Sequence, residues 1–292
     1  MVKSLELCQV STQVLIVSHD NQTSESLLKS GILANNILSL DQIMRTYPEL
    51  AVARKNRSEL EFYYLLTPFV IKYCLLEKGM SYVCYLDADL YFYQNPDPYL
   101  EERLREFSIN IVSHNFLPHF KYLNKYGKNN VAWVGVKNDF DGNEVIEWWS
   151  RKCLDSTGSN LQDGIYGDQL YLDSFQNLSR KVLITESDAE DVAPWNAGRL
   201  SIRDDKLYHN DSEMIYFHFS GLRYYRWFSI LGFSHYNRKM DTYWKSKIFE
   251  PYLEAIKANT KMIPRKFKYD SRHIGYKMFL KALFFKDIKW NF

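Results

Sequence analysis

The sequence is poor in cysteine. Its four cysteines form no CxxC pair and no metal-finger spacing, which excludes a disulfide-rich scaffold and a zinc finger. Cys74 and Cys84 lie in apolar runs, so we expect buried thiols rather than a disulfide. No apolar stretch approaches the roughly 18 residues of a membrane-spanning helix, and no cleavable signal peptide is recognisable. We therefore expect a cytoplasmic protein.

The sequence also lacks a large excess of charge of one sign. Its 37 basic and 35 acidic residues give a formal net charge of +2. A dedicated nucleic-acid-binding domain would carry a clear basic excess, so we expect no nucleic-acid partner. Charged residues make up 25% of the chain and hydrophobic residues 46%, a balance typical of folded proteins that excludes wholesale disorder.

Aromatic residues, by contrast, are abundant. Tyr, Phe and Trp together make up 16% of the 292 residues. Aromatic rings with a polar edge suit carbohydrates and nucleobases, but they suit a protein core equally well. We expect most of them to lie in the core.

Short apolar runs alternate with segments of helical periodicity through most of the chain. Arg57–Lys78 is predicted to be helical, with Pro68 kinking or dividing it. Tyr82–Leu86 is an unbroken apolar strand, as expected where helices cover both faces of a parallel sheet. This alternation predicts an α/β sandwich with a mostly parallel central sheet over residues 1–245. Residues 246–292 are predicted to form a helical, basic and aromatic tail.

The strongest chemical signal is Asp87-Ala88-Asp89, directly after that strand. In open α/β sheets, ligands bind beyond the carboxyl ends of the strands. Two carboxylates at positions i and i+2 point to the same side there, and their mutual repulsion is relieved by a divalent cation. The alternative is that both acids merely cap a turn.

The segment YVCYLDADLYFYQNPDP, residues 82–98, resembles the DxD strand of GT-A glycosyltransferases, particularly bacterial sugar transferases related to family 8. Other segments resemble further elements of that family in the same order, within residues 50–225. They are Asn56-Arg57-Ser58 with Glu61, Tyr63 and Tyr64, then Asn129 to Trp133, Gly167-Asp168-Gln169, Ala193 to Asn196, and His218 to Gly221.

The resemblance implies a GT-A-like fold and a metal-dependent hexosyltransferase that retains anomeric configuration. Its donor would be a nucleoside-diphosphate sugar, with UDP favoured, and its acceptor a glycan or a lipid-linked molecule of surface polysaccharide synthesis. Asp89 would be the main metal ligand, Asp87 would reach the metal or the ribose, and His218 would be the third ligand. Carboxylate and imidazole ligands together suit Mn²⁺ at least as well as Mg²⁺. Alternatively, His218 is a core histidine.

The same resemblance assigns Asp168 and Gln169 to the donor sugar, although Asp168 could equally be a helix N-cap. Asn130 and Trp133 would shape the sugar site, and Trp133 and Trp195 could stack on sugar or lie in the core. Arg57 would pair with phosphate or with a sugar hydroxyl network, and the Gly221 amide and the Arg223 guanidinium could lie near the diphosphate. Either arginine could instead be a solvated charge. An inverting enzyme would instead need a carboxylate base, for which Asp163 or Asp188 could serve.

One departure from the family concerns the beginning of the sequence. GT-A enzymes open with a strand that binds the nucleobase and a helix that follows it. Met1–Gln9 resembles the end of that helix, so the first strand is expected to be missing.

Residues 257–292 carry ten Lys or Arg against two acids, Asp270 and Asp287, interleaved with aromatic and aliphatic residues. This composition suits peripheral docking on anionic lipid at the inner face of a membrane. The alternatives are a solvated helix pair and a junction to a further module.

Two other functions remain open for the whole chain. Some phosphatases place DxD after a hydrophobic strand and use the first acid as the nucleophile, but they require a later lysine and acidic pair. A non-catalytic carbohydrate-binding protein derived from a transferase is the second alternative.

Overall fold

The structure is a computed structural model that describes residues 1–292 except 159–160, 162–164, 261–268, 270–273 and 292. It is a mixed α/β fold whose central sheet consists of four of the apolar runs, in the order β3-β6-β5-β7. These strands are β3 (Tyr82–Leu86), β5 (Ile109–Ser113), β6 (Asn129–Lys137) and β7 (Val182–Thr185).

The prediction of a mostly parallel sheet is wrong, because the central sheet is mixed. β6 pairs antiparallel with both β3 and β5, and only β5 and β7 are parallel. A parallel connection needs a crossover, usually a helix that packs across the sheet. The chain between β5 and β6 instead contains a 3₁₀ segment, Pro118–Tyr126, and returns directly alongside β5.

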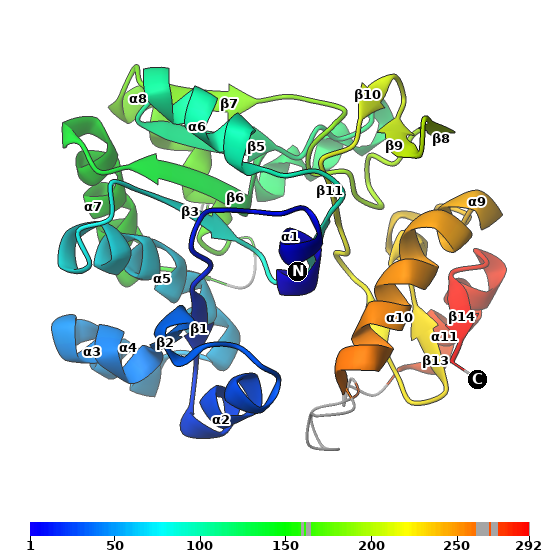
Figure 1. Cartoon of the computed structure of the whole chain (residues 1–292), viewed down its shortest axis with the longest axis horizontal. Coiled ribbons are helices and arrows are strands. Elements are labelled where there is room, and N and C mark those ends of the chain that lie inside the picture. Colours follow the sequence, from blue (N-terminus) through cyan, green and yellow to red (C-terminus); the bar gives the residue numbers. More distant parts are fainter. Residues whose placement is uncertain (159–160, 162–164, 261–268, 270–273, 292) are drawn as a thin grey trace.

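Helices cover both faces of this sheet, and β6 is buried along nearly its whole length. α5 (Glu59–Lys72) and α7 (Phe140–Asp155) pack on one face, where Phe69 and Trp149 join the same core cluster as Val134. α6 (Asp97–Glu106) covers the opposite face (Figure 1), where its Leu100 joins the cluster that contains Trp133. The remaining helices on the first side are α2 (Asn21–Lys29), α3 (Leu40–Thr46) and α4 (Glu49–Asn56).

Helix α5 delivers several side chains to the site described below. It begins at a capping box in which the Ser58 hydroxyl and the Glu61 side chain satisfy each other's backbone N–H groups. Of the two expected effects of Pro68, a kink or a division of the helix, division does not occur, because α5 runs without a break through Pro68. The irregularity follows instead as a π-helical turn, Tyr73–Glu77.

The outer edge of β3 faces an apolar groove of about 800 Å³. Among the described residues β3 pairs only with β6, and β1 (Ile16–Ser18) pairs only with β2 (Ile37–Ser39). Residues of both β1 and β3 line the groove. Near it lies the short helix α1 (Val2–Leu7), which matches the helical character expected for Met1–Gln9 and whose Ser4 hydroxyl accepts a hydrogen bond from Phe92 N–H.

β11 (Tyr216–His218), in the second half of the chain, pairs antiparallel with β4 (Leu90–Phe92) from the first half. Phe219, just after β11, stacks on Tyr252 of α10 (Glu250–Asn259) at a centroid distance of 3.7 Å. The predicted boundary after residue 245 stays a prediction. The other elements are α8 (Phe175–Leu178), β8 (Leu200–Arg203), β9 (Lys206–His209), β10 (Ser212–Glu213), β12 (Arg223–Tyr224), β13 (Phe228–Ile230), α9 (Thr242–Trp244), α11 (Tyr276–Phe284) and β14 (Ile288–Trp290).

All four cysteines are free thiols, and Cys74 is buried while Cys84 is partly buried. This agrees with the expectation from their apolar surroundings. Within the described part of the chain, no helix combines the length and the apolar character needed to cross a bilayer.

The junction between β6 and α7 gives a test of the fold. A Cβ atom at Gly142 would lie 2.1 Å from the Lys137 carbonyl oxygen, a backbone atom that cannot move freely. We expect Gly142→Ala to lower the free energy of unfolding by about 2–4 kcal/mol, measured by urea denaturation. At Gly275, where a Cβ would meet nothing within 4 Å, the same substitution should change stability by less than about 1 kcal/mol. Equal effects would contradict the packing described.

Candidate active site

The pairing of β4 with β11 brings the late histidine to the two early aspartates. In this ladder His218 lies opposite Leu90, the residue that follows Asp89. The next residue along, Phe219, donates its backbone N–H to the Asp89 carbonyl at 2.9 Å. Asp87 and Asp89 stand in the turn between β3 and β4, so the end of β11 closes on that turn.

Asp87, Asp89 and His218 form a cluster whose three potential ligand atoms all lie within 4.8 Å of one another. His218 Nε2 lies 3.3 Å from Asp89 Oδ1. Two carboxylate oxygens and one imidazole nitrogen fit a divalent cation such as Mn²⁺ or Mg²⁺ in chemistry and in spacing. The metal ligands predicted from the sequence therefore converge on one point.

The two aspartates have different surroundings. The pKa of Asp87 is raised to about 6, mainly by burial; His218 opposes the shift and the neighbouring Asp89 adds to it. The Tyr85 hydroxyl donates to Asp87 Oδ1 at 3.1 Å. The Asp89 side chain retains 46% of its exposure. The Asp89 carboxylate is therefore accessible to solutes that enter the site.

The other nitrogen of His218 is held by a buried acid, Asp191. His218 Nδ1 lies 3.0 Å from Asp191 Oδ1, and Asn130 Nδ2 donates to Asp191 Oδ2 at 2.9 Å. Burial alone would lower the pKa of His218, but the carboxylates of Asp89 and Asp191 on either side raise it well above its usual value. With a proton on Nδ1 donated to Asp191, Nε2 is left to face a cation, as in other carboxylate–histidine–metal arrangements.

The backbone around Asp191 is specialised for this contact. Asp191 is fully buried with a positive φ of 48°, a conformation that costs energy for a non-glycine residue. Asn196 stabilises the bend by donating to the Asp191 carbonyl at 2.9 Å and accepting from Ala193 N–H at 2.8 Å. The Val192 carbonyl accepts the His218 N–H at 2.8 Å. The segment Asp191-Val192 is thus held against β11 by a backbone hydrogen bond and by the contact of Asp191 with the His218 ring.

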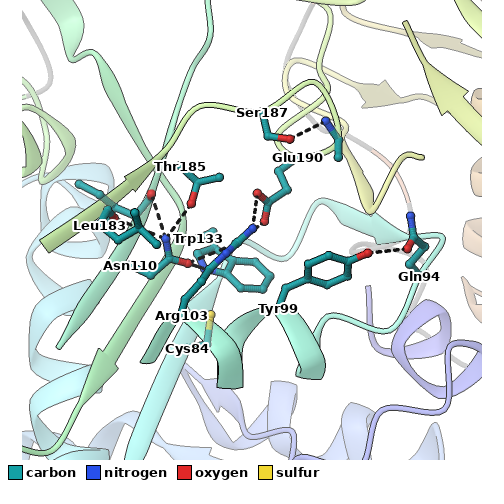
Figure 2. A network of polar contacts seen from close by, with 12 residues as sticks. Cys84, Gln94, Tyr99, Arg103, Asn110, Trp133, Leu183, Thr185, Ser187 and Glu190 are labelled. Atoms are coloured by element: carbon teal, nitrogen blue, oxygen red, sulfur yellow. Dashed lines mark hydrogen bonds and ion pairs between the residues drawn. The ribbon is translucent and has the colours of Figure 1, made fainter. Parts of the chain in front are cut away.

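The preceding residue, Glu190, anchors the same segment to the opposite face of the sheet. Figure 2 shows its carboxylate meeting the Arg103 guanidinium in two contacts, of 2.6 and 2.9 Å. Beside this ion pair, Asn110 accepts from the Trp133 indole N–H at 2.9 Å and donates to the Thr185 hydroxyl at 2.9 Å. The ion pair of Arg103 and Glu190 is bidentate and largely buried, so its geometry is directional. It therefore fixes the position of the chain just before the bend at Asp191.

The cluster lies in a cleft of about 510 Å³ with a strongly aromatic and polar lining. Among the described residues that line it there is no lysine or arginine. The lining consists of Tyr63, Tyr64, Thr67, Tyr85, Asp87, Asp89, His114, Phe116, Leu123, Tyr126, Asn130, Val131, Tyr166, Gly167, Asp168, Gln169, Trp195, His218, Ser220 and Tyr236.

Asp168 and Gln169, which the resemblance assigns to the donor sugar, both line this cleft. Burial raises the pKa of Asp168 to about 7, although a hydrogen bond with Thr67 opposes the shift. The Asp168 carbonyl accepts from the Trp149 indole at 3.0 Å, and Gln169 Nε2 donates to the Tyr126 carbonyl at 3.0 Å. The pair is therefore held by α7 and by the loop before β6.

Four of the predicted nucleotide- and sugar-binding residues are not among the cleft-lining residues, and two of them, Arg57 and Trp133, make contacts elsewhere. The guanidinium of Arg57 donates to the Cys153 carbonyl at 2.7 Å and to the Thr157 hydroxyl at 2.8 Å. It therefore closes the end of α7. Trp133 is buried on the α6 side of β6, stacked on Tyr216 at 5.9 Å, because neighbouring strand residues face opposite sides of a sheet.

Gly221 and Arg223 are the other two predicted residues that do not line the cleft. Gly221 has a positive φ of 78° and follows Ser220, which does line the cleft. Arg223 belongs to β12 and pairs with Ile230 of β13. Asn130 lines the cleft, but its amide is committed to Asp191.

Trp195 is placed at the cleft, edge-on to His218 at a centroid distance of 5.3 Å. Of the two acids considered as bases for inversion, Asp188 is not among the cleft-lining residues, and Asp163 lies outside the described residues.

The sequence analysis missed Asp191, Tyr85 and Thr67. Tyr85 could have been found, because it lies on β3 two residues before Asp87, so both side chains are expected on the same side as the chain leaves the sheet. Nothing in the sequence distinguishes the buried acid Asp191 from an exposed one, since it is identified only by its long-range contact with His218.

No protein-family model matches the chain. It is 26% identical over 233 residues to an uncharacterised protein of Bacillus subtilis (strain 168), YfnF, covering 76% of each chain. It is also 26% identical to YfnD of the same organism over 180 residues, covering 60% of this chain and 58% of that protein. A solved glycosyltransferase involved in glycosylation of the major capsid of PBCV-1 aligns over 71% of this chain and 92% of its own, with a TM-score of 0.41 and 9% identity. At these levels of similarity the chain is not assigned to a family.

Asp191 provides a test of how the metal site is supported. We expect Asp191→Asn to weaken Mn²⁺ binding about 10- to 100-fold, because it removes the charge that orients His218 through Nδ1. Isothermal titration calorimetry on the folded variant measures this. Asp188→Asn, in the same segment but without a contact to His218, is the matched control. Unchanged affinity in Asp191→Asn would refute the supporting role.

Asp168 makes stability depend on pH. Its pKa is about 7 in the folded protein against an ordinary 3.8, so the folded state binds the extra proton between these values. Its contribution to stability is therefore lost as pH rises from about 4 to 7. In metal-free protein, we expect the free energy of unfolding of Asp168→Asn to increase relative to that of wild type as pH rises from 5 to 8. The difference should reach a few kcal/mol, at about 1.4 kcal/mol per pKa unit. Urea denaturation measures the difference, and the exposed Asp41→Asn should show no such trend.

Proposed function

We propose that this protein is a metal-dependent glycosyltransferase that uses a nucleoside-diphosphate sugar, with UDP as the favoured nucleotide. The acceptor is a glycan or a lipid-linked molecule, as in surface polysaccharide synthesis, and the reaction takes place in the cytoplasm. The observation that carries this proposal is the cluster of Asp87, Asp89 and His218 inside an aromatic, polar cleft of about 510 Å³.

The charge balance of the cleft supports a metal-bound diphosphate. Three aspartates line it, and its described lining residues include no lysine or arginine to neutralise a phosphate. A diphosphate would therefore be repelled unless a cation intervened. A divalent ion bound there would bridge the carboxylates to the diphosphate and stabilise it as a leaving group. The contacts of His218 with Asp191 and of Asp87 with Tyr85 would keep both ligands oriented for it.

The rest of the cleft suits a sugar and a base. Tyrosine rings at the lining offer apolar faces and hydroxyl groups, which match the alternating apolar and polar surfaces of a sugar. We assign Asp168 and Gln169 to the sugar hydroxyls. Asp168, with its pKa near 7, can accept or donate a hydrogen bond there.

We further propose hexosyl transfer with retention of configuration. Asp188, one candidate base for inversion, does not line the cleft. Asp87 and Asp89 are assigned to the cation, which leaves Asp168 as the remaining carboxylate among the described lining residues. The anomeric proton coupling in the NMR spectrum of the first product distinguishes retention from inversion.

The phosphatase alternative is not favoured by the cleft. That chemistry requires a lysine near the nucleophilic aspartate, and no described cleft-lining residue is a lysine. A non-catalytic carbohydrate-binding protein needs no metal cluster. It would be stabilised by free sugars, whereas the proposed transferase would be stabilised by a nucleotide together with a metal ion.

Ligand-dependent stabilisation separates these functions. We expect UDP with Mn²⁺ to raise the melting temperature more than UDP or Mn²⁺ alone, by an amount corresponding to about 2.7 kcal/mol at 100 times Kd. GDP tests the choice of base. Stabilisation by free sugars alone, with no response to nucleotide and metal, would favour the carbohydrate-binding protein.

A donor screen tests catalysis directly. We expect slow hydrolysis of a UDP-sugar by wild type and a loss of at least about 100-fold in Asp89→Ala, because several kcal/mol of leaving-group stabilisation depend on the cation. Asp41→Ala, a change of the same type at an exposed position in α3, should keep full activity. Equal turnover by wild type and Asp89→Ala would refute the proposal.

A further inference from the structure

Helix α11 exposes an apolar stripe. Tyr276, Leu280, Leu283 and Phe284 are all exposed, with 75% exposure for Tyr276 and 68% for Phe284. Their spacing of four, seven and eight residues places them on one side of a helix. We call these four residues the α11 stripe. The helix lies at the right of the view in Figure 1, far from α7.

The opposite side of α11 is also apolar, but it is covered. Ala282 is fully buried in a small cluster with Ile230 and Ile288, and the Phe279 ring contacts Phe228 of β13 at 5.4 Å. A helix that is apolar on both sides is normally buried on both. Among the described residues, by contrast, the packing leaves the four members of the α11 stripe 43% to 75% exposed.

Lysines border the stripe. Lys277 and Lys281 follow its members directly along the helix, and Lys239 Nζ lies 5.7 Å from the centre of the Phe284 ring. The helix itself contains no acidic residue. Nearby Asp287 is buried, where it accepts hydrogen bonds from the backbone N–H groups of Phe233 and Ser234. The stripe is thus apolar with a positive margin.

We propose that the α11 stripe docks on an anionic lipid bilayer, with the helix lying in the plane of the interface. Apolar side chains would enter the boundary between headgroups and acyl chains, and the bordering lysines would meet lipid phosphates. Trp290 lies on the same side of its sheet as Phe228, which also touches Phe279, and its partly exposed ring suits the interface.

The lysines favour a membrane over a second copy of the chain as the occupant. An isologous dimer through the stripe would bring the same patch of both copies together. Lys277 and Lys281 of one copy would then face those of the other with no acid on the helix to neutralise them. An anionic surface satisfies the apolar and the charged parts at once.

Vesicle binding tests this without donor, acceptor or metal, so it is independent of the proposed function. We expect wild-type protein to co-sediment with vesicles of phosphatidylcholine containing about a third phosphatidylglycerol. Binding to pure phosphatidylcholine should be at least about tenfold weaker, and 0.5 M salt should weaken binding to the anionic vesicles, since exposed charges are screened.

Two variants with matched controls assign the binding to the stripe. We expect Phe284→Gln to bind about tenfold more weakly, while Phe140→Gln, at a residue of α7 with 79% exposure, binds as wild type does. The double variant Lys277→Gln, Lys281→Gln should bind about 30-fold more weakly, from about 1 kcal/mol for each lysine. Lys55→Gln, Lys152→Gln makes the same change in net charge at distant exposed sites and should bind normally.

Three results would overturn the proposal. The first is equal binding to anionic and neutral vesicles. The second is wild-type binding by Phe284→Gln, with its fold verified by circular dichroism. The third is a dimer of wild type in sedimentation velocity that Phe284→Gln abolishes, which would assign the stripe to a second copy.

Discussion

The contact between His218 and two carboxylates on opposite sides of its ring is the constraint on which the site depends. Nε2 faces Asp89 at 3.3 Å and Nδ1 faces Asp191 at 3.0 Å. In water such a pairing would be weak, but here the ring is buried, so its orientation has few alternatives. The pairing of β4 with β11 sets the distance from His218 to Asp89, and the strained bend at Asp191 sets the distance from His218 to Asp191. Both sides must hold for three ligand atoms to converge.

The need to hold His218 from both sides gives a structural role to short elements, namely β4, β11 and the segment that contains Asp191. β4 and β11 have three residues each, yet they connect the end of a central strand to the second half of the chain. The buried pair of Arg103 and Glu190 connects the Asp191 segment to the far face of the sheet. Burying an ion pair seldom adds net stability, but its geometry is specific. We infer that it contributes position more than stability.

The cleft and the α11 stripe differ in the charge of the residues that form them. The cleft gathers aspartates without lysine or arginine among its described lining residues, so it suits a cation and whatever that cation holds. The α11 stripe has the opposite character, with lysines beside exposed apolar rings. A formal net charge of +2 hides this separation. Net charge describes solubility and long-range attraction, whereas the two surfaces depend on local arrangement.

The sequence alone determined the strand that leads into Asp87 and Asp89, because five consecutive apolar residues and a following acidic pair are local signals. It also singled out His218, Asp168 and Gln169 as candidate site residues, through their likeness to ordered motifs, and the structure brings all three to one cleft. Only the tertiary structure decided the direction of β6, the removal of Arg57 and Trp133 from the cleft, and the role of Asp191. Each of these depends on a partner far away in sequence. Periodicity and spacing record what a residue is and which neighbours share its face, but they do not record which distant segment packs against it.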